Sequence, residues 1–301
     1  MKTILRFLCL FILSLLAACR VFPAMTPASP TPMLTSTPLP PTLTLTLTST
    51  PTLITTATST LTPLPPTQTP TPTWAFQPAG EVTCPILLYH QIADVTALYY
   101  VSPADFAVQM EALRDWGYTP IPISLLAKAI TQGADLPSRP VVITFDDGDQ
   151  NVYTNAFPVM RDLGFTGVIY IIADAVNSPD HLTRDEILEM VTAGWEVGNH
   201  SMSHINLIND HDQVWNEASL SRTRLQEELG IFADTFAYPY GAADTFVMKK
   251  VSSYGYLAAV GLGTTSIQGP GNRLYLSRIA VPNKVTVDQF AALLPWSGMR
   301  P

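Results

Sequence analysis

Short apolar runs alternate with amphipathic stretches from residue 82 almost to the C-terminus. A short continuous apolar run rich in β-branched residues predicts a buried strand, whereas apolar positions that recur every three or four residues predict a helix with one buried face. We expect strands at 85–90, 141–145, 167–172, 195–199, 235–238, 256–260 and 277–281. Helices are expected at 102–114, 124–130, 151–163, 183–194, 213–229, 244–253 and 286–294.

Local signals support several of these helices. Ser102 followed by Pro103 is typical of a helix start, because serine caps free N–H groups and proline suits the first turn. Thr183 and Glu186 match a capping box, in which the two side chains satisfy the first N–H groups reciprocally. Pro158 removes one N–H from the helix expected at 151–163 and predicts a kink there.

The alternation of strand and helix predicts the fold class. It is typical of parallel strands joined by helical crossovers. About seven such units in roughly 220 residues favour a distorted β/α barrel, with an open doubly wound sheet as the alternative. In either fold, functional side chains gather at the carboxyl ends of the strands.

The first 19 residues have a different character. Lys2 and Arg6 precede an apolar run at 7–18, whose 12 residues are too few to span a bilayer and are typical of a signal-peptide core. The run ends in Leu-Ala-Ala-Cys, which resembles the bacterial lipobox. This resemblance implies that Cys19 becomes lipidated and anchors the mature protein in a membrane. The alternative is a simple secretory signal that is cleaved nearby.

We interpret residues 20–80 as a disordered linker between the signal peptide (1–19) and a globular domain (82–301). Positions 23–73 contain 19 threonines, 13 prolines and no charged side chain. Such a segment cannot bury enough apolar surface to offset the entropy of ordering it. In polyproline II geometry its reach would be at most roughly 150 Å.

Charge and cysteine content exclude some classes of function. The chain carries a net charge of −8, and because residues 1–81 contribute +2, the remainder carries −10 without any basic run. This balance argues against nucleic acid as a partner, since binding phosphates requires clusters of Lys and Arg. Lipidation of Cys19 and loss of Cys9 with the leader would leave Cys84 unpaired, so no disulfide framework is expected. We expect Cys84 to act as a small apolar core residue.

Two carboxylates, Asp146 and Asp147, directly follow the strand expected at 141–145. Burying adjacent acids costs several kcal/mol for each unpaired charge, so a metal or a strong set of donors is expected beside them. Successive strand side chains point to opposite faces, but a turn at Gly148 would bring both carboxylates to one site.

A second signal follows the strand expected at 195–199, where His200 and His204 are four positions apart. Histidines at this spacing share one face of a helical turn, and their imidazoles can converge on one divalent cation. Asp147 completes an Asp/His/His ligand set, which leaves coordination positions open for water and substrate.

The string TFDDG around Asp146 and the string HSMSH from His200 resemble the first two motifs of the polysaccharide deacetylase domain (NodB homology, carbohydrate esterase family four). Their order and their separation of 54 residues, from Asp146 to His200, suit that family, and the resemblance covers about 82–294. It implies a NodB-like barrel, with Asp146 as the general base and Asp147, His200 and His204 as ligands of a divalent metal, usually Zn²⁺.

The string FAYPYG at 236–241 resembles the third motif of this family, which lines the substrate groove. The resemblance implies that Pro239 and Tyr240 contact the substrate, with the backbone N–H of Tyr240 as an oxyanion donor. Two positions depart from the family pattern. Ala237 stands where an arginine commonly orients the base, and Arg278 stands where a histidine supplies the catalytic acid. Either activity is lost, or other residues have taken these roles.

The strand end Leu-Tyr-His at 88–90 resembles the opening strand of the poly-N-acetylglucosamine deacetylase branch, in which the motifs are circularly permuted. There the histidine of this strand acts as the acid. We therefore expect His90 to protonate the departing amine and Arg278 to supply the missing guanidinium to Asp146. The alternative for His90 is a histidine that merely satisfies its hydrogen bonds at a strand end.

Together these features predict an exported, lipid-anchored, monomeric, metal-dependent hydrolase that removes N-acetyl groups from a cell-surface polysaccharide containing N-acetylglucosamine. An O-acetyl glycan esterase on the same scaffold is one alternative. A non-catalytic glycan-binding lipoprotein is another, although binding alone would not require Asp146 beside the ligand set.

Overall fold

The computed structural model describes residues 72–296, and within that range the strands of the central sheet match the predicted ones closely. These strands are β3 (Ile86–Tyr89), β8 (Pro140–Phe145), β9 (Val168–Ile171), β10 (Glu196–Asn199), β11 (Thr235–Ala237), β12 (Ala258–Val260) and β14 (Ile279–Ala280). A two-residue strand, β6 (Thr119–Pro120), also pairs with β8.

The predicted helices are confirmed as well. They are α1 (Pro103–Asp115), α2 (Ile123–Gln132), α3 (Phe157–Asp162), α4 (Arg184–Thr192), α5 (Ser221–Leu229), α6 (Thr245–Ser253) and α7 (Val287–Ala291). Two of them are preceded by π-helical turns, namely η1 (Val152–Ala156) before α3 and η4 (Trp215–Leu220) before α5. Shorter 3₁₀ turns are η2 (Ala173–Ala175), η3 (His211–Gln213), η5 (Pro239–Gly241) and η6 (Pro270–Asn272).

The two capping signals behave as predicted. The Ser102 hydroxyl accepts the N–H of Asp105 at the start of α1. Thr183 and Glu186 form the capping box of α4. Pro158 lies in the first turn of α3, where the π-helical backbone of η1 changes to α-helical. The missing N–H of proline therefore falls where the hydrogen-bond register changes.

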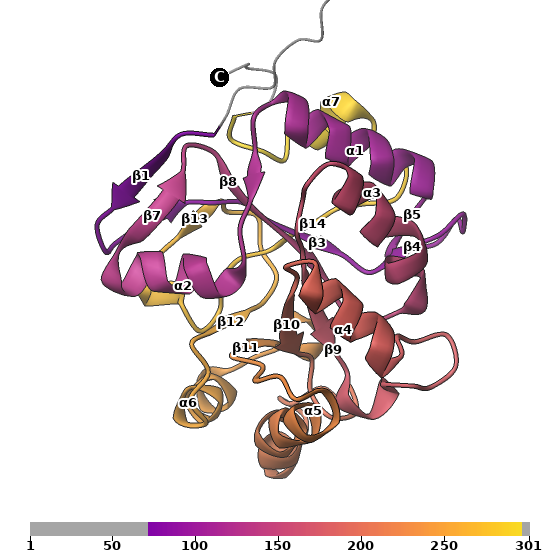
Figure 1. The fold of residues 1–301 in the computed structure, drawn as a ribbon. Coiled ribbons are helices and arrows are strands. Elements are labelled where there is room, and N and C mark those ends of the chain that lie inside the picture. The colour runs from indigo at the N-terminus through magenta and orange to yellow at the C-terminus, as the bar shows by residue number, and fades with distance from the viewer. Residues whose placement is uncertain (1–71, 297–301) are drawn as a thin grey trace, which may run out of the picture. The chain divides into compact units, whose positions relative to one another are not determined.

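The sheet is parallel throughout, in the order β12-β11-β10-β9-β8-β3-β14. From β3 to β12 each new strand adds to the same edge, whereas a doubly wound sheet reverses its order at a switch point. The two edges approach each other where Val260 and Leu276 form a parallel bridge. The prediction of a distorted β/α barrel is thus confirmed, and Figure 1 shows the helices arranged around the strands.

The two-residue period of the strands separates two apolar layers. Leu87, Ile143 and Ile169 face the surrounding helices and belong to the larger core cluster. Ile86 and Val142, one position earlier on their strands, face the barrel interior with a second cluster. Continuing this alternation places the side chains at positions 90, 146, 200 and 278 on the interior side, at the carboxyl ends of their strands or next to them.

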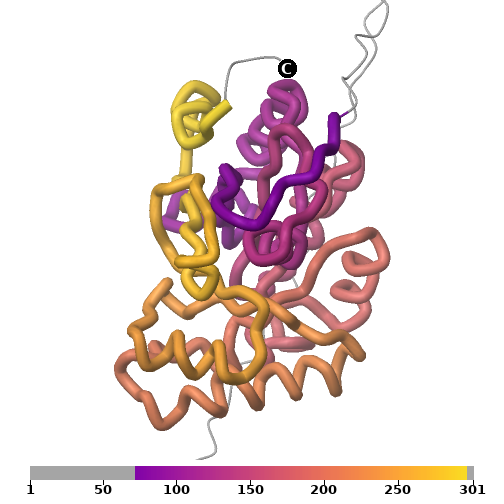
Figure 2. The backbone as a smooth tube through the Cα atoms, turned by 90° about the vertical axis from the view of Figure 1, so that its left-hand side faces the viewer, coloured from indigo at the N-terminus to yellow at the C-terminus, as the bar shows by residue number. Residues whose placement is uncertain are grey.

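The C-terminal segment completes the outer layer beside the first helix. Figure 2 shows the end of the described chain lying next to α1. The rings of Trp116 and Phe290 stack with centroids 6.2 Å apart and join α7 to the end of α1. Cys84 is fully buried at the start of the domain, as expected of an apolar core residue, and burial raises the pKa of its thiol.

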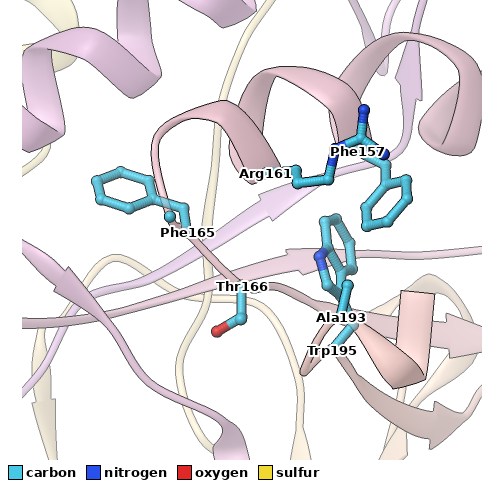
Figure 3. A pocket seen from close by; sticks show the side chains of 7 residues that line it. Phe157, Arg161, Phe165, Thr166, Ala193 and Trp195 are labelled. Carbon is cyan, nitrogen blue, oxygen red and sulfur yellow. The ribbon is translucent and has the colours of Figure 1, made fainter. Parts of the chain in front are cut away.

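A cavity of about 120 Å³ lies at the opposite end of the barrel from the predicted site. Its walls include Phe157, Phe165, Thr166 and Trp195 (Figure 3). Thr166 and Trp195 come just before β9 and β10, so the cavity lies at the amino ends of the strands. In a β/α barrel those ends contribute to stability, whereas the carboxyl ends carry the chemistry.

The boundary predicted for the linker requires a correction. Within the range 20–80, residues Trp74–Gln77 form strand β1, which pairs antiparallel with β7 (Ala134–Pro137). Other short pairs join β2 (Val82–Thr83) to β13 (Ile267–Gln268) and β4 (Gln91–Ile92) to β5 (Tyr100–Val101). These strands are short and depend on their pairing partners, and their local pattern did not predict them.

The predicted signal peptide, Cys19 and the linker as far as residue 71 lie outside the described residues. Between residues 72 and 296, none of the helices combines the length and the apolar character that crossing a bilayer requires.

Replacement of Gly198 by alanine should destabilise the fold. A Cβ at this position would overlap the ring of Tyr170, which is fully buried in the barrel interior. Overpacking of this kind typically costs about 1–3 kcal/mol, and we expect a loss of that size in the free energy of unfolding measured with urea. Gly271→Ala is the matched control, because a Cβ there has no neighbour within 4 Å. Equal stability of the two variants would contradict the packing described.

Candidate metal centre

The two adjacent carboxylates reach the same site because the chain turns directly after β8. Asp147 and Gly148 have φ values of 71° and 79°, both in the left-handed region. The turn expected at Gly148 is therefore present, and Asp147 itself adopts a conformation that is unfavourable for a residue with a Cβ. His200 Nε2 lies 3.6 Å from Asp146 Oδ2 and 3.4 Å from Asp147 Oδ1.

His200 is held by the sheet. It follows β10, is almost completely buried, and its Nδ1 lies 2.8 Å from the carbonyl oxygen of Ala237 at the end of β11. Because a carbonyl only accepts hydrogen bonds, Nδ1 must carry the proton. The lone pair of the neutral ring is then on Nε2, which faces the two carboxylates, as a metal ligand requires.

His204 reaches the site by a different route from the predicted one. The expectation of a helical turn from His200 to His204 is wrong, since Ser201 and His204 have φ values of 71° and 62° and the segment is a loop. The Ser201 hydroxyl accepts the N–H of His204 at 2.9 Å and stabilises a tight turn instead. The loop still brings His204 Nε2 to 3.4 Å from Asp147 Oδ1.

The three side chains fit a divalent cation. One ligand atom from each of Asp147, His200 and His204 lies within 4.8 Å of the others, and this is the sole such group of three among residues 72–296. Asp147 Oδ1 is buried without a hydrogen-bond partner. Three lone pairs that converge in this way repel one another unless a cation or a proton lies between them. Two imidazoles and a carboxylate form a donor set typical of catalytic zinc sites with an open position.

Arg278, one residue before β14, forms a bidentate ion pair with Asp146. Nη1 lies 2.6 Å from Oδ1 and Nη2 lies 2.7 Å from Oδ2, and both side chains are almost completely buried. Arg278 Nε donates to the carbonyl of Gly261, which fixes the orientation of the fork. Burial alone would raise the pKa of Asp146, but the charge of Arg278, followed by His200, holds this pKa well below its ordinary value.

His90 follows β3 on the interior side of the barrel and is partly buried. Its ring lies 4.7 Å from that of Tyr99, on the β4–β5 loop. Burial lowers the pKa of His90, the charges of Asp146 and Asp147 oppose this effect, and Arg278 and His200 add to it. His90 therefore lies close enough to both carboxylates for their charges to act on it.

Tyr240 lies on the other side of the imidazole pair, in the turn η5 after β11. Its φ is 60°, its side chain is exposed, and its ring lies 4.6 Å from that of His204. Pro239, the residue before it in the turn, is buried. The Tyr275 hydroxyl donates to the carbonyl of Gly241 at 2.6 Å and holds the end of the turn. The site residues expected from the sequence within the described range therefore belong to this one end of the barrel, whereas Cys19 lies outside that range.

The sequence analysis missed two residues beside the site. Tyr99 contacts His90 from a loop whose pattern carries no signal. Glu217 is a buried carboxylate that hydrogen-bonds the loop carrying His204. Its position shares the apolar face of the helix expected at 213–229, with Val214 and Ala218, and a charge on a buried face was the available signal.

Comparison with known proteins places this site in a family. Residues 133–259 match the family model described as polysaccharide deacetylase. A Bacillus subtilis protein, YxkH, named as a candidate polysaccharide deacetylase, is 27% identical over 215 residues, which cover 70% of this chain and 75% of that protein. The poly-β-1,6-N-acetyl-D-glucosamine N-deacetylase of Staphylococcus aureus is 26% identical over 178 residues, or 54% of this chain and 60% of the relative's length.

Solved structures of similar proteins have the same fold. The crystal structure of a Bacillus anthracis protein, described as a candidate polysaccharide deacetylase, superimposes with a TM-score of 0.64 at 28% identity, covering 71% of this chain and 70% of that one. The matched region of the family model contains both carboxylates and both histidines of the site. Residues 133–259 therefore match the polysaccharide deacetylase family, within a described domain that has the NodB-type fold.

Proposed function

We propose that this protein is an exported, lipid-anchored hydrolase that uses a divalent metal, most simply Zn²⁺, to remove N-acetyl groups from a polysaccharide containing N-acetylglucosamine. One observation supports this above all others. Two neighbouring carboxylates have separate partners at a single site, since Asp147 faces the imidazole pair while Asp146 is paired with Arg278. A protein that only binds glycan would not need two adjacent carboxylates with separate partners.

In this proposal, Asp147, His200 and His204 hold the cation. When bound, such an ion acts as a Lewis acid that polarises an amide carbonyl and lowers the pKa of water. Asp146 accepts the proton of the attacking water. Because its pKa is held low, its carboxylate is already ionised at neutral and mildly acidic pH and is ready to act as the base.

Arg278 replaces the guanidinium that the family motif would supply from position 237. Its two short hydrogen bonds orient both oxygens of Asp146, whereas Ala237 is part of the apolar cluster of the barrel interior. An Arg–carboxylate fork of this kind adds geometric specificity as well as charge. The fork itself is thus preserved, although it comes from a different strand.

His90 is the proposed acid that protonates the departing amine. A lowered pKa makes its protonated form a stronger acid, and burial beside the carboxylates keeps it near the reacting group. The backbone N–H of Tyr240 is the proposed donor to the developing oxyanion, and Pro239 shapes the same wall. Tyr240 and Tyr99 present exposed rings next to His204 and His90, which suits a sugar substrate.

Export and anchoring rest on the N-terminal sequence. The signal-peptide pattern and the lipobox-like end at Cys19 support transfer across a membrane and lipid attachment. The Thr/Pro-rich stretch then serves as a tether that lets the enzyme search a polymer layer. The staphylococcal relative, named for deacetylation of poly-β-1,6-N-acetyl-D-glucosamine, supports a glycan of this kind as substrate.

Removal of the metal or of the base should abolish acetate release. We expect the purified protein to release acetate from β-1,6-linked N-acetylglucosamine oligomers, to lose this activity with a chelator, and to regain it with Zn²⁺. Asp146→Asn should lower kcat by about 10²–10⁴-fold, as expected for loss of a general base. Enzymatic acetate assay on this substrate and on chitin and peptidoglycan fragments provides the measurement. If metal-loaded protein released no acetate from any of them, the glycan-binding alternative would be favoured.

Loss of the guanidinium should move the pH profile. In Arg278→Gln, burial is no longer opposed by the arginine charge, so the pKa of Asp146 rises. The base must be ionised, and the acidic limb of kcat/KM should therefore shift to higher pH, by about 1–3 units. Arg278→Lys should shift it less, because the charge remains. Arg224→Gln, on the exposed side of α5, is the control, and an unmoved acidic limb in Arg278→Gln would remove this role.

Substitution of the proposed acid should distinguish N- from O-deacetylation. His90→Gln should lower kcat on an N-acetylated oligomer by about 10²–10⁴-fold. The effect should be smaller on an O-acetylated analogue, because an alcohol needs less help from an acid to depart than an amine does. His211→Gln serves as the control, since His211 is exposed and paired with Asp244. Equal losses on both substrates, or none on either, would refute the assignment of His90.

A further inference from the structure

Glu217 is a buried carboxylate outside the ligand set, with its exposed fraction at 5%. Its partners are three donors of the loop between the two histidines. Oε2 accepts the N–H groups of Met202 at 3.1 Å and of Ser203 at 2.9 Å, and Oε1 accepts the Ser203 hydroxyl at 2.7 Å. Carboxylates are rarely buried unless they are fully paired, and here the pairing is entirely with this loop.

The loop needs external support because its backbone is unfavourable. Ser201 and His204 both lie in the left-handed region, which residues with a Cβ occupy only where the surroundings hold them. The loop carbonyls of Ser201 and Met202 accept the N–H groups of Ala173 and Asp174 in η2, both at 3.0 Å. The loop is thus held from two sides, by η2 through its carbonyls and by Glu217 through its N–H groups.

The helix that carries Glu217 is itself irregular. Residues Trp215–Leu220 form the π-helical turn η4, at whose end the N–H of Ser221 donates to the carbonyl of Asn216, five residues back. Single π-helical turns inside α-helices occur frequently at functional sites. The α-helix predicted at 213–229 contained no such change in hydrogen-bond register. Glu217 lies within the π-helical turn, so this turn sets its position against the loop.

The two histidines depend on this support to different degrees. His200 extends from β10 and is fixed by the carbonyl of Ala237, without any contribution from the loop. His204 lies on the loop alone, directly after the residue that Glu217 binds twice. A change at position 217 therefore displaces the second histidine and leaves the first in place.

We propose that Glu217 is the positioning residue of His204, which sets the affinity and the ligand geometry of the metal centre from outside the ligand set. This inference rests on the metal centre of the proposed function. The carboxylate is required because all three partners are donors. A glutamine keeps one accepting oxygen but points its own N–H₂ group at a donor, and an alanine leaves two part-buried N–H groups without this acceptor.

Direct metal binding tests the proposal without relying on activity. We expect Zn²⁺ titrated by calorimetry into the full chain to bind Glu217→Gln and Glu217→Ala about 10–100-fold more weakly than the native protein, with the larger loss for alanine. Ser203→Ala removes one of the three donors and should have a smaller effect. Glu227→Gln, on the exposed face of α5, is the matched control and should bind as the native protein does.

A double-mutant cycle separates positioning from a general loss of structure. If Glu217 acts through His204, Glu217→Gln should not weaken Zn²⁺ binding further in a His204→Ala background. The visible spectrum of the Co²⁺-loaded Glu217→Ala variant should likewise change toward that of His204→Ala.

Equal affinity of native and Glu217 variants would overturn this inference and leave the proposed function intact. The same penalty for Glu217→Gln with and without His204 would also overturn it, since the effect would then be structural. Failure of the native chain to bind any divalent ion would overturn both proposals.

Discussion

The buried ion pair between Asp146 and Arg278 is the contact on which the rest of the site depends. It joins β8 to the chain just before β14, 132 residues away, and both partners are almost completely removed from water. Without a partner, a carboxylate in that position would either take up a proton or draw water into the core, because an unpaired buried charge is strongly unfavourable. The pair keeps the charge on Asp146 and, in the same contact, brings the last strand of the sheet to the first ones.

The pair also explains how this chain tolerates its departures from the family pattern. The guanidinium comes from the chain just before β14 and not from β11, where the motif would place it, and Ala237 offers its backbone carbonyl to His200 instead. In a closed barrel, interior side chains from several strands can reach the same carboxylate. The positive charge beside Asp146 is therefore more strictly required than the particular strand that supplies it.

The two carboxylates of one sequence motif meet different partners because of a single backbone turn. Asp146 continues the interior side of β8 and meets Arg278, whereas the left-handed φ of Asp147 directs its oxygen to the imidazole pair. One histidine is fixed by the regular sheet and the other by a loop that Glu217 and η2 hold together. The candidate metal centre thus combines a histidine fixed by the sheet with one whose position depends on polar contacts of its loop.

The sequence by itself determined the strands, the helices, their caps and the residue types of the site. These follow from local patterns, such as the continuous β-branched apolar run at 141–145 or the capping box at Thr183, which act between near neighbours. Tertiary structure decided the rest: the pairing of β1 with β7, the loop in place of a helical turn at 200–204, the clamp by Glu217 and the reach of Arg278 to Asp146. All of these depend at least in part on contacts with groups outside their own segment, whose free energy exists only once the barrel has brought those groups together.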